Sequence, residues 1–388
     1  MRFVRITENN QIELLRCGAE LFPALVAAID IAAQEVWLET YLFERDEAGL
    51  PIMEALIRAA RRGVSVHVTL DWAGTGSAQA AALRRTFVSA GVQCRVFNPW
   101  FRRGISRNHR KIVVVDGQVA FLGGINIIDD LRADHDSSIR LPSPRWDIAA
   151  RIRGPLVEEL HRAVSAHWKL GASLRERITD RIRKFRRKTI HKLHTKPIVG
   201  ALVVSDNFRN RRTIYRAYLQ ALAGARSSVV LANPYFAPGR KLRNALVNAA
   251  SRGVEVTLLL GVGQYHLQDA VAQSYYPQLL AAGVRIFEYR KTQLHGKVAV
   301  VDEHWATFGS TNHDGLSLFV NHEANVLVFD PGFSRVLRSE IERALEDSTR
   351  VCAGEHVASP WYSRIWNHCA ALLYRNALRI LSSGNSVD

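Results

Sequence analysis

The sequence predicts an α/β fold built from two similar halves, each with a mixed, mostly parallel sheet that is flanked by helices. The chain has 388 residues, which is too long for one ordinary hydrophobic core. One order of strands and helices occurs twice along it, and each copy ends in the same polar motif. Because 47% of the residues are apolar and 23% are charged, the composition is that of a folded globular protein. We therefore expect a duplicated chain whose halves face each other as a pseudo-two-fold unit.

Each half opens with an apolar strand, continues through a helix to the tripeptide Arg-Gly-Val and then enters a β-branched strand. A second helix and an Ala-Gly-Val tripeptide lead to a further strand, after which the polar motif follows. The corresponding segments are 36–43, 62–64, 65–70 and 90–92 in the first half, and 229–236, 252–254, 255–260 and 282–284 in the second. The order strand–helix–strand–helix–strand–strand implies α/β layers with a largely parallel sheet.

This pattern divides the chain into four regions. We predict a first half at 1–170, a basic linker at 171–200, a second half at 201–350 and a C-terminal amphipathic extension at 351–388. The basic stretch 175–196 is either a solvated charged face or a patch for anionic lipid headgroups, and its composition leaves both open.

The C-terminal extension carries apolar residues at mostly helical spacing, interrupted by arginines. The apolar positions are Trp361, Ile365, Trp366, Leu372, Leu373, Ala377 and Ile380, and the basic ones are Arg364, Arg375 and Arg379. A stripe of this kind either lies in a membrane interface or packs on its own domain.

The charge balance favours an anionic partner. The chain has 52 basic and 36 acidic residues, a net charge of +16, which suits either nucleic acid or an anionic membrane surface. The N-terminal residues lack the apolar core of a signal peptide, and no stretch reaches the ~18 uncharged apolar residues of a spanning helix. Any membrane association should therefore be peripheral. The four cysteines show no metal-binding spacing, so we expect neither a metal site nor a disulfide scaffold.

A motif of the form His-x-Lys-x4-Asp-x6-Gly-x-x-Asn occurs twice. The first copy comprises His109, Lys111, Asp116 and Asn126, and the second comprises His295, Lys297, Asp302 and Asn312. One copy could arise by accident, whereas two copies at matching places in a duplicated chain are a strong signal. The copies differ in that the first carries Gly124 where the second carries Ser310, so a hydroxyl is present in the second half alone.

The residue types of the motif suit a phosphate group. Residues i and i+2 of a strand share a face, so each histidine should lie beside the lysine of its own motif. If the halves come together, two histidines and two lysines surround one spot, where the lysines can neutralise the non-bridging oxygens. We predict that Asn126, Asn312 and Ser310 donate further hydrogen bonds to the phosphate.

The aspartates of the motifs are expected to face away from the histidines. We group Asp116 and Asp302 with the catalytic histidines and lysines, but an aspartate seven residues after a histidine faces the other way in an uninterrupted strand. We expect both to brace the motif or cap its turn, because Asp116-Gly117 is itself a hairpin signal. The carboxylates that orient the histidines should then come from elsewhere, and the candidates are Asp147 and Glu323.

The paired motif resembles the phospholipase D superfamily over nearly the whole chain. Within it, the sequence is similar to bacterial cardiolipin synthases that lack N-terminal transmembrane helices. The supporting stretches are 233–239, 287–290, 294–301, 304–307, 316–318 and 323–326. The resemblance implies a phospholipase D-like fold and a metal-free, two-step displacement. By analogy, His109 is the nucleophile that forms a phosphatidyl-histidine intermediate, and His295 is the acid and base.

The resemblance also implies a function. We expect a cardiolipin synthase that needs no cofactor and transfers a phosphatidyl group from phosphatidylglycerol or phosphatidylethanolamine to phosphatidylglycerol. Its partners would be anionic and zwitterionic phospholipids, at the cytoplasmic side of the inner membrane as a peripheral protein. The alternatives are a phosphodiesterase that hydrolyses phospholipid or nucleic acid with the same chemistry, and a non-catalytic scaffold. Intact motifs argue against the scaffold, and nucleic acid is disfavoured because that branch often uses short single-motif chains.

Overall fold

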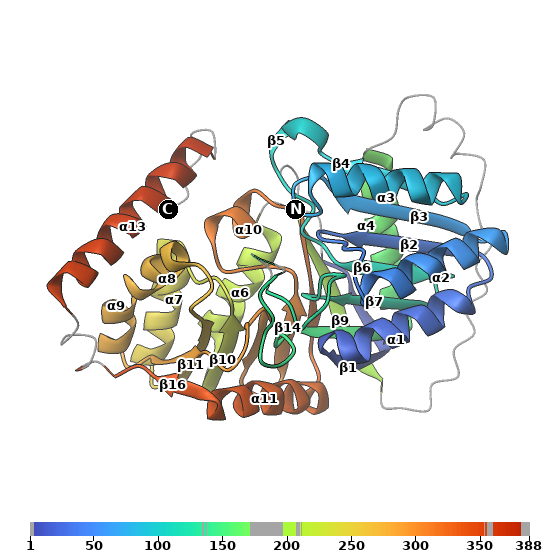
Figure 1. Ribbon diagram of the computed structural model, residues 1–388. Helices are drawn as coiled ribbons and strands as arrows, with labels where there is room; N and C mark the ends of the chain where they lie inside the picture. The colour runs from blue at the N-terminus through green and yellow to red at the C-terminus, as the bar shows by residue number, and fades with distance from the viewer. Residues whose placement is uncertain are drawn as a thin grey trace. The chain divides into compact units, whose positions relative to one another are not determined.

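The computed structural model contains two compact units (Figure 1). The N-terminal unit is formed by residues within Phe3–Asp129 and Ala149–Leu202, and the C-terminal unit by residues within Asp130–Ile148 and Val203–Asp388. The segment 130–148 thus belongs to the unit of the second half, although it follows the first motif in the chain. The structure describes residues 4–133, 136, 138–170, 197–206, 210, 212–352, 354 and 360–381.

The predicted basic linker lies almost entirely outside the described residues. Its stretch 175–196 falls within the undescribed range 171–196, so the choice between a solvated face and a lipid-binding patch stays open.

A mixed sheet forms the centre of the N-terminal unit. Strands β2, β3 and β4 pair in parallel, whereas β2 with β6, β6 with β7, β7 with β8 and β1 with β9 pair antiparallel. The spatial order is β9 (Ile198–Ser205), β1 (Ile6–Arg16), β8 (Ile148–Arg153), β7 (Val119–Gly123), β6 (Ile112–Val115), β2 (Glu35–Thr40), β3 (Ser65–Asp71) and β4 (Gln93–Phe97).

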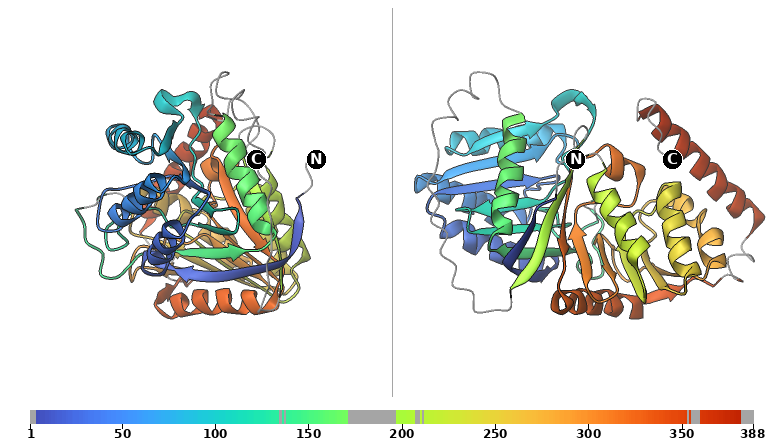
Figure 2. Two further views of the ribbon diagram at one scale, coloured as in Figure 1. Left: turned by 90° about the vertical axis from the view of Figure 1, so that its right-hand side faces the viewer. Right: turned by 180° about the vertical axis from the view of Figure 1, so that it is seen from behind.

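Helices cover both faces of this sheet. Figure 2 shows α4 on the face opposite to α1 and α2. The apolar side chains of α1 and α2 pack with those of β2 and β3 in one core, which includes Leu25, Ile52 and Val68. The helices are α1 (Cys17–Asp30), α2 (Gly49–Arg61), α3 (Ser77–Ser89) and α4 (Leu156–Leu170), with a 3-10 turn η1 (Pro99–Phe101) before the short strand β5 (Arg102–Ile105).

The C-terminal unit repeats the same arrangement. Strands β10, β11 and β12 pair in parallel, and β13, β14, β15 and β16 each join by antiparallel pairing. As β2 lies between β3 and β6 in the N-terminal unit, β10 lies between β11 and β13 here. The spatial order is β16 (Ser348–Arg350), β12 (Arg285–Tyr289), β11 (Glu255–Gly261), β10 (Ser228–Asn233), β13 (Val298–Val301), β14 (Trp305–Gly309) and β15 (Glu323–Val328).

The predicted α/β class and the duplication are thereby confirmed, but the sheets are less parallel than predicted. Strands β2 to β4 and β10 to β12 run in parallel, but the motif strand β6 or β13 enters the sheet beside β2 or β10 in the opposite direction. A tight hairpin then returns the chain along β7 or β14.

Helix α11 packs against the motif strand β13 of the C-terminal unit. Helix α11 packs on β10, β12, β13 and β14, α7 packs on β11, and α13 lies along α8 (Figure 1). The helices are α6 (Thr213–Gly224), α7 (Arg240–Ser251), α8 (His266–Gln273), α9 (Tyr276–Ala281), α10 (Gly315–Phe319), α11 (Pro331–Glu346) and α13 (Trp361–Leu381).

Candidate active site

Both polar motifs lie immediately before a buried strand. Strand β6 begins one residue after Lys111 and β13 one residue after Lys297, and all residues of both strands are buried. The prediction that each histidine and lysine alternate within a strand is therefore wrong. In the second copy, the backbone N–H groups of His295 and Gly296 both donate to the carbonyl of Trp146 at 2.9 Å, so this stretch bonds outside the sheet ladder.

A local hydrogen bond, rather than strand alternation, holds each lysine beside its histidine. Lys111 Nζ donates to the carbonyl oxygen of His109 at 2.7 Å, and Lys297 Nζ donates to the carbonyl oxygen of His295. All four residues are buried. In both motifs, therefore, the lysine ammonium group is bound to the backbone carbonyl of the histidine two residues before it.

The aspartates of the motifs brace the fold. The carboxylate of Asp116 accepts three backbone N–H groups, from residues 33 to 35, at 2.8 to 2.9 Å. That of Asp302 accepts backbone N–H groups from residues 226 to 228 and the hydroxyl of Ser227. Both stand beyond the far end of the four-residue strand that follows the histidine and lysine, and that strand alone spans roughly 13 Å. We therefore assign them no chemical role and remove them from the catalytic set.

A carboxylate from the first half of the chain contacts the second histidine. Asp147 Oδ2 lies 2.5 Å from His295 Nδ1, and both side chains are buried within the C-terminal unit. Asp147 also accepts the backbone N–H of Ile148 at 2.7 Å, which fixes the carboxylate. Of the two carboxylates that the sequence offers for orienting a histidine, the structure thus places Asp147 against His295.

Two hydrogen bonds hold the segment that carries Asp147 in this position. The N–H of Trp146 donates to the carbonyl of Gln293 at 2.9 Å, and Thr292 Oγ1 donates to the carbonyl of Ser143 at 2.7 Å. A Cβ atom at Gly296 would lie 2.4 Å from the Trp146 ring, so glycine is the residue that this close approach permits. The middle residue of the second motif is therefore set by the segment that carries Asp147.

Glu323 has a different contact. It is fully buried, and its carboxylate accepts the hydroxyl of Ser310, which in turn accepts the backbone N–H of Ala324 at 3.0 Å. A serine hydroxyl has one proton to donate, and Glu323 receives it. The donation of this hydroxyl to a phosphate stays a prediction. The orientation of a histidine by Glu323 stays a prediction.

Several buried amide and imidazole groups point to a polar ligand. Among the described residues, the Oδ1 atoms of Asn126 and Asn312 make no hydrogen bond, and neither side-chain polar atom of Asn108 does. The ring nitrogens of His313 also lack a partner there, and burial lowers the pKa of this histidine to about 3, so it is neutral. Buried polar atoms without partners are costly, which is typical of places where a ligand binds.

Asn108 and His313 were missed in the sequence because each adjoins a motif residue without belonging to the motif. Asn108 directly precedes His109, and its backbone N–H donates to Asp71 Oδ2 at 2.6 Å. Burial raises the pKa of Asp71 to about 6, against the hydrogen bonds that its carboxylate accepts. Tyr41 is a further neighbour, since its ring packs edge-on against that of His109 at 4.8 Å between centroids.

Comparison with known proteins assigns the chain to a family. Residues 25–155 and again 218–345 match the model of the family described as cardiolipin synthase, PLD-like domain. Cardiolipin synthase B of Salmonella typhi is 37% identical over 342 residues, which cover 86% of this chain and 80% of that protein. The chain belongs to the cardiolipin synthase family. The resemblance noted in the sequence is confirmed.

Other relatives agree with this family. Cardiolipin synthase B of Escherichia coli K12 is 37% identical over 345 residues, and the minor cardiolipin synthase ClsB of Bacillus subtilis is 31% identical over 349 residues, which cover 88% of this chain and 83% of that protein. The crystal structure of phosphatidylserine synthase from Haemophilus influenzae has a TM-score of 0.69 at 14% identity, over 96% of this chain and 95% of that one. At that identity the likeness shows the fold alone.

Burial and neighbouring charges shift the pKa values of Lys297 and Asp147 at the second motif of this cardiolipin synthase family member. Burial lowers the pKa of Lys297 to about 8, although Asp147 and Glu323 act to raise it. Burial opposes the charged form of Asp147, but the positive charges of Lys297 and then His295 outweigh it and lower the pKa of Asp147. Because an ionised carboxylate can only accept, His295 Nδ1–H donates to Asp147, and Nε2 is the ring nitrogen that faces away from this carboxylate.

A pH dependence follows from the pKa of Lys297. The ammonium form predominates below pH 8 and is lost as the pH rises through that value, so binding of an anionic phosphate should weaken there. We expect kcat/KM to fall tenfold per unit well above about pH 8. Lys297→Arg, which stays charged, should move this decline upward even if the maximum is lower. An unmoved decline in that variant would mean that another group titrates.

Proposed function

We propose that this chain is a cardiolipin synthase, a phosphatidyltransferase that moves the phosphatidyl group of one phospholipid onto the free glycerol hydroxyl of phosphatidylglycerol. The observation that carries this proposal is a pair of intact His-Lys motifs in a chain 37% identical to cardiolipin synthase B over most of its length. The donor is phosphatidylglycerol or phosphatidylethanolamine.

The chemistry has two displacements at phosphorus. A ring nitrogen of His109 attacks the donor, the bond from phosphorus to the headgroup oxygen breaks, and His295 gives its proton to the departing alcohol. His295 then takes the proton of the incoming glycerol hydroxyl, whose oxygen attacks the phosphatidyl-histidine and releases His109. In this scheme Asp147 stabilises His295 in its protonated form, as a carboxylate does beside a catalytic imidazole.

The remaining motif residues bind the phosphate. Lys111 and Lys297 place positive charge where the negative charge on the non-bridging oxygens grows in the transition state. Asn126 and Asn312 can donate their side-chain amide N–H groups to these oxygens, while their unpartnered Oδ1 atoms can accept from a substrate hydroxyl. This set requires no metal ion for charge neutralisation, and each member can be tested singly.

The proposed substrates place the enzyme at a membrane surface. The described residues include no helix long and apolar enough to cross a bilayer. The net charge of +16 suits the anionic cytoplasmic leaflet, which attracts basic proteins. We propose a peripheral association with the cytoplasmic side of the inner membrane.

Lipid products from defined mixtures test the function. Purified protein should form cardiolipin and glycerol from phosphatidylglycerol alone, and none from phosphatidylethanolamine alone, because the latter has no glycerol hydroxyl to act as acceptor. Isotope-labelled phosphatidylethanolamine added to phosphatidylglycerol shows by mass spectrometry whether its phosphatidyl group enters cardiolipin. Phosphatidic acid as the main product would instead identify a hydrolase, and cardiolipin formed equally by His109→Ala would reject the proposed site.

A further inference from the structure

Helix α13 has two faces of different character. One face, which we call the inner face, is buried and carries Asn367, Ala370, Ala371 and Leu378. At 3.6 residues per turn these positions span roughly 100° of the helix circumference. The opposite, outer face carries six apolar or aromatic residues that are 41% to 67% exposed, Trp361, Tyr362, Ile365, Trp366, Leu372 and Leu373, together with exposed Cys369 and Asn376.

The inner face is held by specific contacts within the C-terminal unit. Asn367 Nδ2 donates to Gln273 Oε1 of α8 at 3.4 Å, and the hydroxyl of Tyr374 accepts the backbone N–H of Gly315 at 2.9 Å. Leu378 packs so closely that a Cβ atom on Gly315 would lie 2.3 Å from it. The position of α13 is therefore fixed without any contribution from the outer face.

The outer face matches the interface of a bilayer. Its apolar and aromatic residues lie within 361–373 and span roughly 140° of the circumference, and an exposed stripe with two tryptophans and a tyrosine is unusual on a surface that meets only water. Amphipathic rings of this kind favour the boundary between headgroups and acyl chains, where one side is apolar and the other is wet. The stripe is too narrow for a spanning helix and suits one that lies flat.

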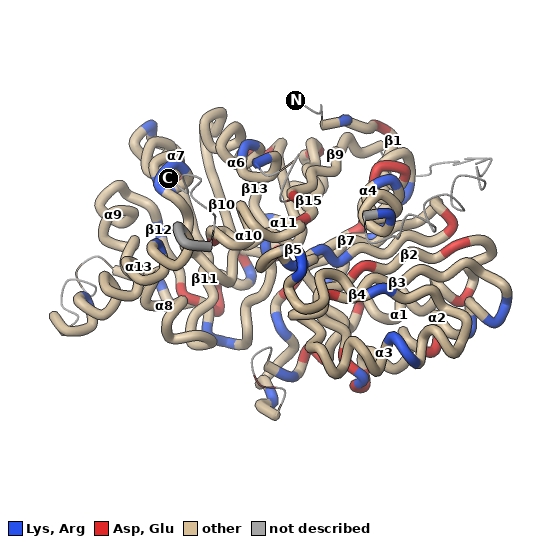
Figure 3. Tube along the Cα trace, turned by 90° about the horizontal axis from the view of Figure 1, so that it is seen from above, with Lys and Arg blue, Asp and Glu red and all other residues tan. Residues whose placement is uncertain are grey.

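The charge of α13 selects an anionic lipid surface. Residues 361–381 include three arginines and no aspartate or glutamate, and Figure 3 shows no acidic position on this helix. Arg364 and Arg375 are exposed along one border of the outer face. Their aliphatic stems can lie along apolar surface while the guanidinium groups reach lipid phosphates. A second copy of the same basic face would be repelled, which disfavours dimerisation through it.

The inner face leads directly to a motif residue. Gly315, which donates to Tyr374, stands three residues after Asn312, and between them Asp314 caps α10 by accepting the N–H groups of Leu316 and Ser317. A helix bound at the membrane would thus hold the loop that follows the second motif close to the source of lipid.

We propose that α13 is an interfacial helix that lies in the surface of an anionic phospholipid bilayer through its outer face and anchors the Asn312–Gly315 loop there through its inner face. The proposal rests on the proposed function, since it identifies where the lipid substrates are taken from. It assigns the outer face to binding of the bilayer and not to chemistry.

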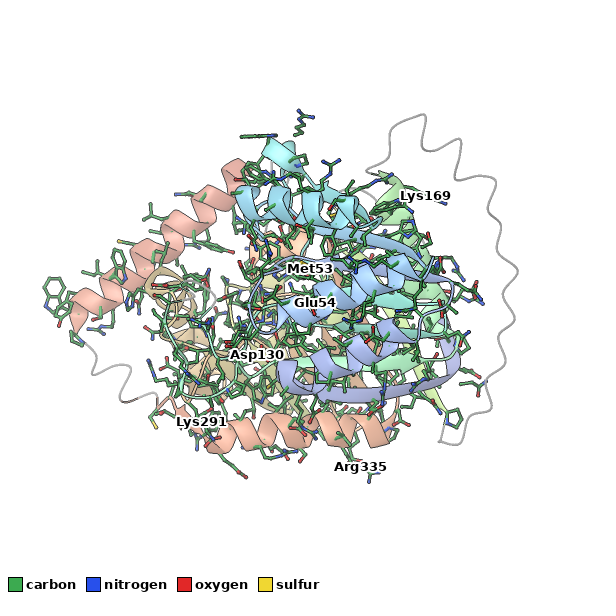
Figure 4. All side chains as sticks on the ribbon, turned by 45° about the vertical axis from the view of Figure 1, so that its right-hand side comes forward. Met53, Glu54, Asp130, Lys169, Lys291 and Arg335 are labelled. Atoms are coloured by element: carbon green, nitrogen blue, oxygen red, sulfur yellow. The ribbon has the colours of Figure 1, made fainter. Side chains whose placement is uncertain are left out.

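Vesicle sedimentation with the full chain tests this. The triple variant Trp361→Ser, Trp366→Ser, Leu373→Ser should bind phosphatidylglycerol-containing vesicles at least about tenfold more weakly than the wild type. The matched control is Val336→Ser, because Val336 is an apolar residue 48% exposed on α11 of the same unit, next to Arg335, which is labelled in Figure 4. That control should bind like the wild type, and vesicles of phosphatidylcholine alone should bind the wild type less.

Turnover of short-chain phosphatidylglycerol below its critical micelle concentration separates this proposal from the proposed function. The triple variant should act on such dispersed lipid within about twofold of the wild type, which also shows that it is folded. If it is not, Trp366→Ser alone should still weaken vesicle binding. Unchanged vesicle binding by these variants overturns the docking role of α13, as does a wild-type dimer that the triple variant converts to monomer. A wild type that makes no cardiolipin from either lipid form overturns the function instead.

Discussion

His295→Ala should accumulate a phosphatidyl group on His109 while its turnover of phosphatidylglycerol falls by about 10⁴-fold or more. The experiment uses a phosphatidyl ester of p-nitrophenol as donor, because its leaving group departs without a proton and the first displacement needs no acid. The second displacement lacks its base, so the intermediate should persist. Intact-protein mass measurement, followed by peptide mapping at alkaline pH, locates the adduct.

His109→Ala supplies the comparison. It should form no adduct with the same donor, because the nucleophile is gone and His295 serves only to move protons. An adduct on His295 in this variant, together with none on His109 in His295→Ala, would reverse the assigned order of the two histidines.

Asp147→Asn should lower kcat by about 10²-fold to 10⁴-fold, because a neutral amide neither fixes the Nδ1–H tautomer of His295 nor stabilises its protonated form. The same change removes a negative charge that acts to raise the pKa of Lys297. The alkaline decline in rate should therefore begin at a lower pH than in the wild type. A pH–rate profile measures both effects in one series.

Asp302→Asn is the matched control in the same unit. Its carboxylate holds three consecutive backbone N–H groups at the start of β10. Its replacement should lower the free energy of unfolding by about 1–3 kcal/mol, while kcat stays within about tenfold where the protein is folded. An equal loss of activity in both variants, with no shift of the pH profile in Asp147→Asn, would show that Asp147 is merely structural.

The duplication could be predicted because it depends on short-range sequence patterns that occur in both halves. Strand composition, the Arg-Gly-Val and Ala-Gly-Val turns and the repeated motif all depend on neighbouring residues, and the structure confirms the order of elements in both halves. The extent of the motif strand could not be predicted. The backbone around His295 bonds to Trp146 and not to the sheet, and nothing local in the sequence shows that competition.

Side-chain contacts between residues far apart in the sequence could not be predicted either. Asp147 was a candidate by its place before a strand-like run, but its partner lies 148 residues away, so the sequence could not say which histidine it meets. The contact between Ser310 and Glu323 could not be predicted either, because Glu323 is brought to Ser310 only by the pairing of β14 with β15. The stripe predicted at the C-terminus does not pack on its own unit, because Trp361, Trp366 and Leu373 are exposed and other residues of α13 form its buried face; its place in a membrane interface stays a prediction.

Whether the two motifs carry out one reaction is tested most directly by the turnover of His109→Ala, His295→Ala and the double variant. If both histidines serve the same two displacements, either single change should lower kcat by about 10⁴-fold or more, and the double change should lower it little further. Two independent sites would give the opposite pattern. Each single variant would then keep about half of the wild-type rate, only the double variant would be inactive, and the single-reaction mechanism would be contradicted.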